Sequence, residues 1–94
     1  MKEFEFKFEL GQIVVTRGVH DYCVGNKIDL FPFVFRHRIG DWGEVCKEDK
    51  KSNDEAVRDG LRILSAYTLP TKKKIWIITE WDRSVTTILF PDEY

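Results

Sequence analysis

Three strand-like segments follow one another in the C-terminal third of the chain, and this feature limits the possible folds most. The segments are residues 61–69, 74–81 and 85–90. Only short polar turns separate them, and connections this short join antiparallel neighbours, so we expect a three-stranded meander. The middle segment contains Ile75-Trp76-Ile77-Ile78, which is apolar on both faces and therefore predicts a central strand with Trp76 in the core.

The N-terminal segment alternates almost perfectly between apolar and charged residues. Its apolar positions are Phe4, Phe6, Phe8 and Leu10. A period of two predicts a strand over residues 3–10 with one face on the core, and Gln12 to Thr16 predicts its continuation or a second strand. A free sheet edge at residues 3–8 could support dimer formation, so the oligomeric state stays open.

The region between these strands favours helices. The expected helices are Val19 to Val24, Leu30 to Ile39 after an Asp29 N-cap, and about 53–59, opened by a Ser52–Glu55 capping box and ended by Gly60. Together the segments predict a single α+β domain over residues 1–94. In that domain an antiparallel sheet of four to five strands carries two to three helices packed on one face.

Charge and cysteine content narrow the functional classes. With 15 basic and 16 acidic residues the net charge is −1, so nucleic acid could be bound only by local contacts. The start of the chain lacks the apolar core of a signal peptide and no apolar run is long enough to span a bilayer, so we expect a cytoplasmic protein without a membrane partner. The spacing of His20, Cys23, His37 and Cys46 does not favour zinc. We expect no cofactor and no metal, with both thiols reduced.

Two segments contain residues that could support catalysis, although phosphate-loop, dinucleotide and nucleophile-elbow motifs are missing. His37 lies at the end of an apolar helix and either ties the following loop to the body or transfers a proton. Glu80 and Arg83 lie near a strand end and could join His37 in a metal-independent, ribonuclease- or toxin-like site. The structural alternative is a hairpin turn closed by Asp82, Arg83 and Ser84.

Aromatic and arginine side chains offer a binding function instead. Trp42 lies in a loop between glycines and Trp81 precedes a turn, so each is either a partly exposed anchor or a cap on the core. Exposed aromatics beside arginine are typical of protein interfaces. The sequence therefore favours a protein-binding function without catalysis, with contacts at Arg36, Trp42, Trp81 and Arg83.

Several motifs also resemble one known family. They are Leu10-Gly11-Gln12-Ile13-Val14, Arg36-His37 with Gly40-Asp41-Trp42-Gly43-Glu44, Leu64-Ser65-Ala66-Tyr67, Ile75-Trp76-Ile77-Ile78-Thr79-Glu80, and Asp82 to Leu89 with Pro91. In these motifs the chain resembles small bacterial "plasmid-related" proteins of plasmids, phages and integrated elements. Members sometimes carry the label of a type I restriction methylase subunit, but this chain has no glycine-rich motif for a methyl-donor domain. The resemblance implies a mobile-element setting, in which a binding protein would act as an accessory factor, and it supplies no catalytic residues.

Overall fold

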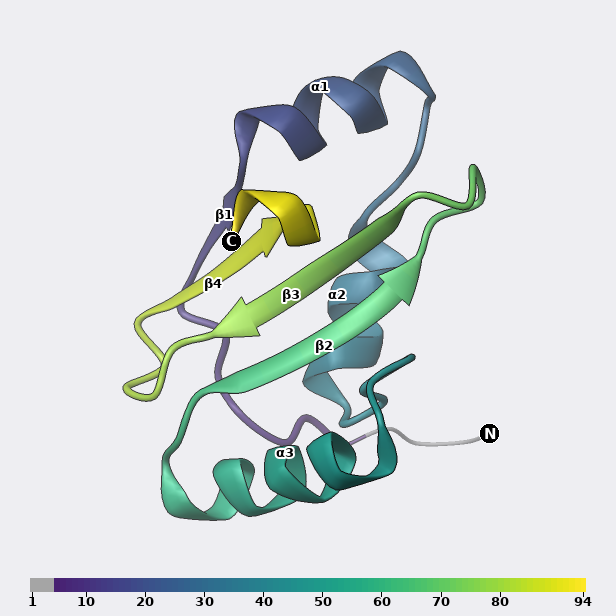
Figure 1. The fold of residues 1–94 in the computed structure, drawn as a ribbon. Coiled ribbons are helices and arrows are strands. Elements are labelled where there is room, and N and C mark those ends of the chain that lie inside the picture. The colour runs from purple at the N-terminus through teal and green to yellow at the C-terminus, as the bar shows by residue number, and fades with distance from the viewer. Residues whose placement is uncertain (1–4) are drawn as a thin grey trace.

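The computed structural model describes residues 5–94, which form three helices, one four-stranded sheet and a final 3-10 turn (Figure 1). In chain order the elements are β1 (Gln12–Val15), α1 (Arg17–Gly25), α2 (Phe31–Arg38), α3 (Lys47–Asp59), β2 (Ile63–Thr68), β3 (Lys74–Thr79), β4 (Val85–Leu89) and η1 (Pro91–Glu93). The predicted α+β class is confirmed. No helix within the described range is both long and apolar enough to cross a membrane.

The sheet has the strand order β1-β4-β3-β2. Strands β2, β3 and β4 pair antiparallel and form the predicted meander, with Ser65 opposite Ile77 and Ile77 opposite Ile88. Strand β1 pairs with β4 in parallel, so the sheet is mixed. Three helices and the strands β2 and β3 separate β1 from β4, and this long connection gives the chain room to return beside β1 in the same direction.

The strand predicted over residues 3–10 is wrong where the structure describes it, and Phe4 lies outside the described residues. Residues 5–11 form no strand and cross the C-terminal end of α2, where the Lys7 amide donates to the Arg38 carbonyl over 2.9 Å. The alternation is nevertheless meaningful, because Leu10 is buried and Phe8 is half-buried. The sheet edge on this side is therefore β1, not residues 3–8.

The first two helices fall where the sequence predicts them, but α3 is longer. It begins at Lys47, so the expected capping box at Ser52 lies inside the helix. Glu48 and Asp49 occupy its first turn, where carboxylates interact favourably with the helix dipole. It ends as predicted at Gly60, whose φ of 69° is left-handed and suits glycine.

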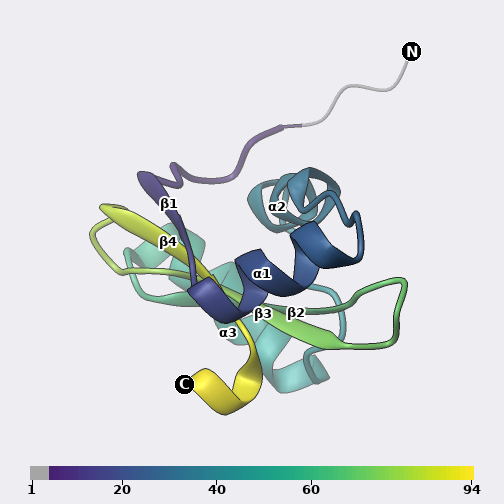
Figure 2. The same cartoon turned by 90° about the horizontal axis from the view of Figure 1, so that it is seen from above.

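Helices α1 and α2 cover one face of the sheet, α3 lies against the edge formed by β2, and η1 lies beyond the opposite face (Figure 2). Within residues 5–94 the interior contains two apolar clusters. The larger contains Val19, Cys23, Tyr67, Leu69, Ile75, Ile77, Ile88 and Phe90, and the smaller contains Trp42, Ala56 and Ile63. Trp76, predicted as core, is only half-buried on the opposite face.

Candidate functional site

A chain of buried polar side chains runs between the two apolar clusters. His37 is fully buried, with Nδ1 2.5 Å from Ser65 Oγ and Nε2 2.9 Å from Thr79 Oγ1. The Thr79 hydroxyl lies 2.7 Å from that of Thr86, which donates to the Leu10 carbonyl over 2.7 Å.

The last of these bonds fixes the direction of all the others. Because Thr86 donates to a carbonyl, its oxygen must accept from Thr79. Thr79 then accepts from His37 Nε2–H, which leaves Nδ1 as the acceptor for the Ser65 hydroxyl. Burial, assisted by the positive charge of Arg83, lowers the pKa of His37 to about 3, so its imidazole is neutral near pH 7.

The structure does not assemble the three residues of the nuclease alternative. His37 and Arg83 both lie against the Phe8 ring, with the His37 ring centroid at 5.2 Å and the Arg83 guanidinium carbon at 5.6 Å. Glu80, however, follows Thr79, whose side chain contacts His37, so strand alternation directs Glu80 to the opposite face. His37 is enclosed as well, because both its ring nitrogens are bonded to buried hydroxyls.

Arg83 has a structural role. Its guanidinium donates to the carbonyls of Ala56, Leu61 and Glu80, which ties the end of α3 to the β3–β4 turn. The predicted hairpin network is confirmed between Asp82 and Ser84, whose amide and hydroxyl both donate to Asp82 Oδ1.

Trp42 is a core residue, so of its two predicted roles the structure supports the cap on the core. Only 4% of it is exposed, it stacks on Phe8, and its indole N–H donates to Asp54 over 3.0 Å. Arg36 is half-exposed and donates to Asp41 over 2.8 Å, and this contact lowers the pKa of the Asp41 carboxyl.

Trp81 is the predicted contact residue that the structure leaves most accessible. It is 65% exposed in the β3–β4 turn. Leu61, also exposed, is held near this turn by the bond from Arg83 to its carbonyl. An aromatic anchor is therefore available at this end of the sheet.

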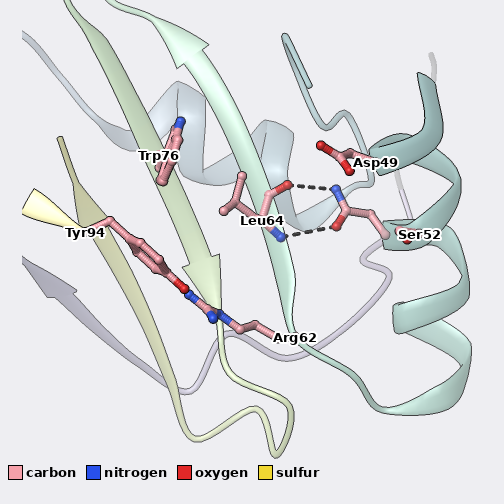
Figure 3. Close-up of a pocket in the computed structure, with 7 residues that line it drawn as sticks. Asp49, Ser52, Arg62, Leu64, Trp76 and Tyr94 are labelled. Atoms are coloured by element: carbon pink, nitrogen blue, oxygen red, sulfur yellow. Dashed lines mark hydrogen bonds between the residues drawn. The ribbon is translucent and has the colours of Figure 1, made fainter. Parts of the chain in front are cut away.

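The larger candidate site is a pocket on the face of the sheet away from α1 and α2, and we call it the open-face groove. It encloses about 330 Å³ and is lined by Asp49, Ser52, Asn53, Arg62, Leu64, Trp76 and Tyr94. Figure 3 shows Leu64 of β2 between α3 on one side and Trp76 and Tyr94 on the other. A second hollow of about 270 Å³ shares Asp49, Leu64 and Trp76 and extends the groove toward Glu44 and Lys74.

Aromatic and charged groups line this groove in an ordered way. The Arg62 guanidinium lies over the Tyr94 ring at 5.0 Å, and Tyr94 meets Trp76 edge-on with centroids 5.7 Å apart (Figure 3). Within residues 5–94, neither Arg62 nor Asp49 has a side-chain hydrogen bond or ion pair. The groove thus presents one unpaired positive and one unpaired negative group beside an aromatic surface.

Sequence reasoning missed the groove because its residues come from distant segments. One signal was available in the strand register. Leu64 and Ala66 of β2 share one face with Arg62, which directly precedes the strand, and Trp76 of β3 lies opposite Ala66. Once the meander is accepted, these residues fall on one surface, whereas the position of Tyr94 depends on the turn of η1.

Comparison of the chain with protein-family models, with curated proteins and with solved structures finds no match. Among the described residues no group of three or more histidine, cysteine, aspartate and glutamate side chains is placed to hold a metal ion.

Proposed function

We propose that this chain is a binding protein, a cytoplasmic accessory factor of a mobile element that holds a segment of a protein partner in the open-face groove. The observation that carries the proposal is a groove of about 330 Å³ in which the Arg62 guanidinium lies over the Tyr94 ring and Tyr94 meets Trp76 edge-on. Every buried side-chain nitrogen and oxygen of the described residues has a hydrogen-bond partner, whereas Arg62 and Asp49 in the groove have none.

The composition of the groove suits a protein segment. Tryptophan, tyrosine and arginine are the residues that contribute most to protein interfaces, and Trp76, Tyr94 and Arg62 supply one of each. Arg62 can pair with an acidic side chain of the partner and Asp49 with a basic one, so a segment carrying both charges is favoured.

The same charges disfavour nucleic acid as the occupant. A phosphate backbone requires several cations along its path. Here Arg62 and Lys74 are accompanied by the carboxylates of Asp49 and Glu44, so the field along the groove is mixed. The overall charge of −1 acts in the same direction.

The test is affinity capture by the tagged chain from a host that carries the element, with quantitative mass spectrometry. We expect Tyr94→Ala and Arg62→Glu each to reduce capture of the same protein at least about tenfold, because an interface anchor contributes roughly 1.4 kcal/mol or more. Phe31→Ala is the matched control, since Phe31 is 69% exposed and Tyr94 67% exposed.

Trp81→Ala tests the other exposed anchor in the same experiment. If Trp81→Ala abolishes capture of the protein while Tyr94→Ala and Arg62→Glu still capture it, the partner binds at the β3–β4 turn and the groove is not the site. Equal capture by all four variants would reject both surfaces.

A further inference from the structure

The two edges of the sheet differ in whether their backbone groups are occupied. At the β2 edge, the Asn53 amide donates to the Leu64 carbonyl over 2.8 Å and its oxygen accepts from the Leu64 amide over 3.2 Å. Beside it, the Ala66 carbonyl accepts from the Glu44 amide over 2.7 Å, and the Ala66 amide donates to the Trp42 carbonyl over 3.2 Å.

The contacts that cover the β2 edge require a close approach by Gly43, which forms an isolated β-bridge to Ala66. A Cβ at Gly43 would lie 2.0 Å from the Ala66 carbonyl oxygen, and its φ of 76° is left-handed. The β2 edge is therefore closed to further strands by side-chain and backbone contacts together.

The β1 edge has no backbone partner on its outer side among residues 5–94. The amides of Gln12 and Thr16 donate to Ser84 and Ile88 of the β4 side, each over 3.0 Å. Because backbone groups alternate along a strand, those of Ile13 and Val15 point away from β4. The strand is also apolar and accessible, with Ile13 48% and Val14 39% exposed. An accessible apolar edge of this kind is a template for another strand.

We propose that a second copy of this chain occupies the β1 edge, paired antiparallel with Val14 on the two-fold axis. In this register the outward groups of Ile13 pair with those of Val15 in the second copy, and the symmetric pair repeats the contact, which gives four backbone hydrogen bonds. The two Val14 side chains face one another as a non-hydrogen-bonded pair, where side chains approach most closely.

Charge at the ends of β1 favours this direction. Glu9 precedes the strand and Arg17 follows it, with side chains 81% and 94% exposed although each has one surface ion pair within its own chain. Antiparallel pairing brings Glu9 of one copy to the end where Arg17 of the other lies, whereas parallel pairing would align like charges. Because the β2 edge is sealed, pairing at β1 ends at two copies and forms no open fibre.

The sharpest test is a disulfide across the two-fold axis. In a Cys46→Ser background, Val14→Cys should give a cross-linked dimer under mild oxidation, because the paired Cα atoms would lie about 4.5 Å apart. Gln12→Cys is the matched control on the same strand and face. Its two copies would lie about 13 Å apart, which is beyond disulfide reach.

Sedimentation of the unmodified chain over a range of concentrations supplies the second measurement. We expect a monomer–dimer equilibrium in which the Ile13 and Val15 amides exchange more slowly as the dimer forms. Ile13→Pro removes an outward N–H that β4 does not use, so it should raise the dimer dissociation constant about thirtyfold, through two of the four hydrogen bonds.

Three results would overturn the proposal. The first is a chain that stays monomeric at every concentration. The second is equal cross-linking by Val14→Cys and Gln12→Cys. The third is protection of the Ile13 and Val15 amides only when a different protein is added, which would make the edge a site for a foreign strand. An unchanged circular dichroism spectrum and cooperative unfolding of Ile13→Pro would establish that its effect is on pairing.

Discussion

The two faces of the sheet use polar side chains in opposite ways. On the face covered by α1 and α2, polar groups are buried and bonded to one another in a single chain: His37, Ser65, Thr79 and Thr86. On the open face, Arg62 and Asp49 have no hydrogen-bond or ion-pair partner within residues 5–94. Of the three catalytic candidates, His37 thus lies buried, where a substrate has no access.

The hydrogen bonds on the covered face explain why the fold tolerates a buried histidine at position 37. Burying a polar group without a partner is expensive, but both ring nitrogens of His37 are satisfied by hydroxyls. Along β2, Ser65 lies between Ile63 of the smaller cluster and Tyr67 of the larger one. The polar chain therefore links the two clusters, and the fold alone accounts for the buried position of His37.

The largest expected effect follows from removing the centre of the buried chain. We expect His37→Ala to lower the free energy of unfolding by about 3–5 kcal/mol, because it leaves a cavity and removes the acceptor of the Ser65 hydroxyl and the donor to the Thr79 hydroxyl. Urea denaturation monitored by tryptophan fluorescence measures the change.

His20→Ala provides the control for that measurement. The His20 side chain is 65% exposed, so its removal should change stability by no more than about 0.5 kcal/mol. A His37→Ala cost as small as that of the control would mean that the hydroxyls find other partners, and the contrast between the two faces would lose its basis.

The second effect is a loss of stability in mild acid. The folded state holds the pKa of His37 at about 3, whereas an unfolded histidine titrates near 6.5, so the unfolded state binds more protons below that pH. The stabilisation is complete above about pH 6.5 and is lost progressively as pH falls toward 3. Between pH 7 and pH 5 we expect about 2 kcal/mol less stability from this group.

Comparison with His37→Gln isolates that contribution, since glutamine keeps a donor and an acceptor but does not titrate. The difference in unfolding free energy between the native chain and this variant should shrink by about 2 kcal/mol from pH 7 to pH 5. A constant difference would show that the pKa of His37 is the same in the folded and unfolded states, so that burial does not lower it.

Local patterns predicted the meander and the first two helices well, because β-branched runs, turn residues and caps act over a few positions. The start of α3 was missed because residues 47–52 are polar and carry no apolar period, although lysine and glutamate are good helix formers. Alternation at residues 5–10 gave a false strand, since an extended segment crossing a helix end can also turn alternate side chains inward, as it does for Phe8 and Leu10 although Phe6 is exposed.

The site was harder to predict, because its character depends on which residues find partners. Arg36 and Arg83 look alike in the sequence, yet Arg83 donates to three carbonyls while Arg36 pairs with Asp41 at the surface. Trp42 and Trp81 are both flanked by turn residues, and only Trp81 is exposed. These differences arise from tertiary contacts and have no local signature.

The smallest effect on stability is expected on the open face. Tyr94→Ala removes a ring that is 67% exposed, and with it the contacts to Arg62 and Trp76, so we expect a loss of at most about 1 kcal/mol. The same variant should lose the captured partner, whereas His37→Gln, if it folds, should retain it. Thermal unfolding and capture measured on one preparation of each variant separate the two properties. If Tyr94→Ala instead destabilised the chain as much as His37→Ala, the Tyr94 ring would be part of the core. The open-face groove would then no longer be the preferred binding surface, and Trp81 would be the remaining candidate anchor.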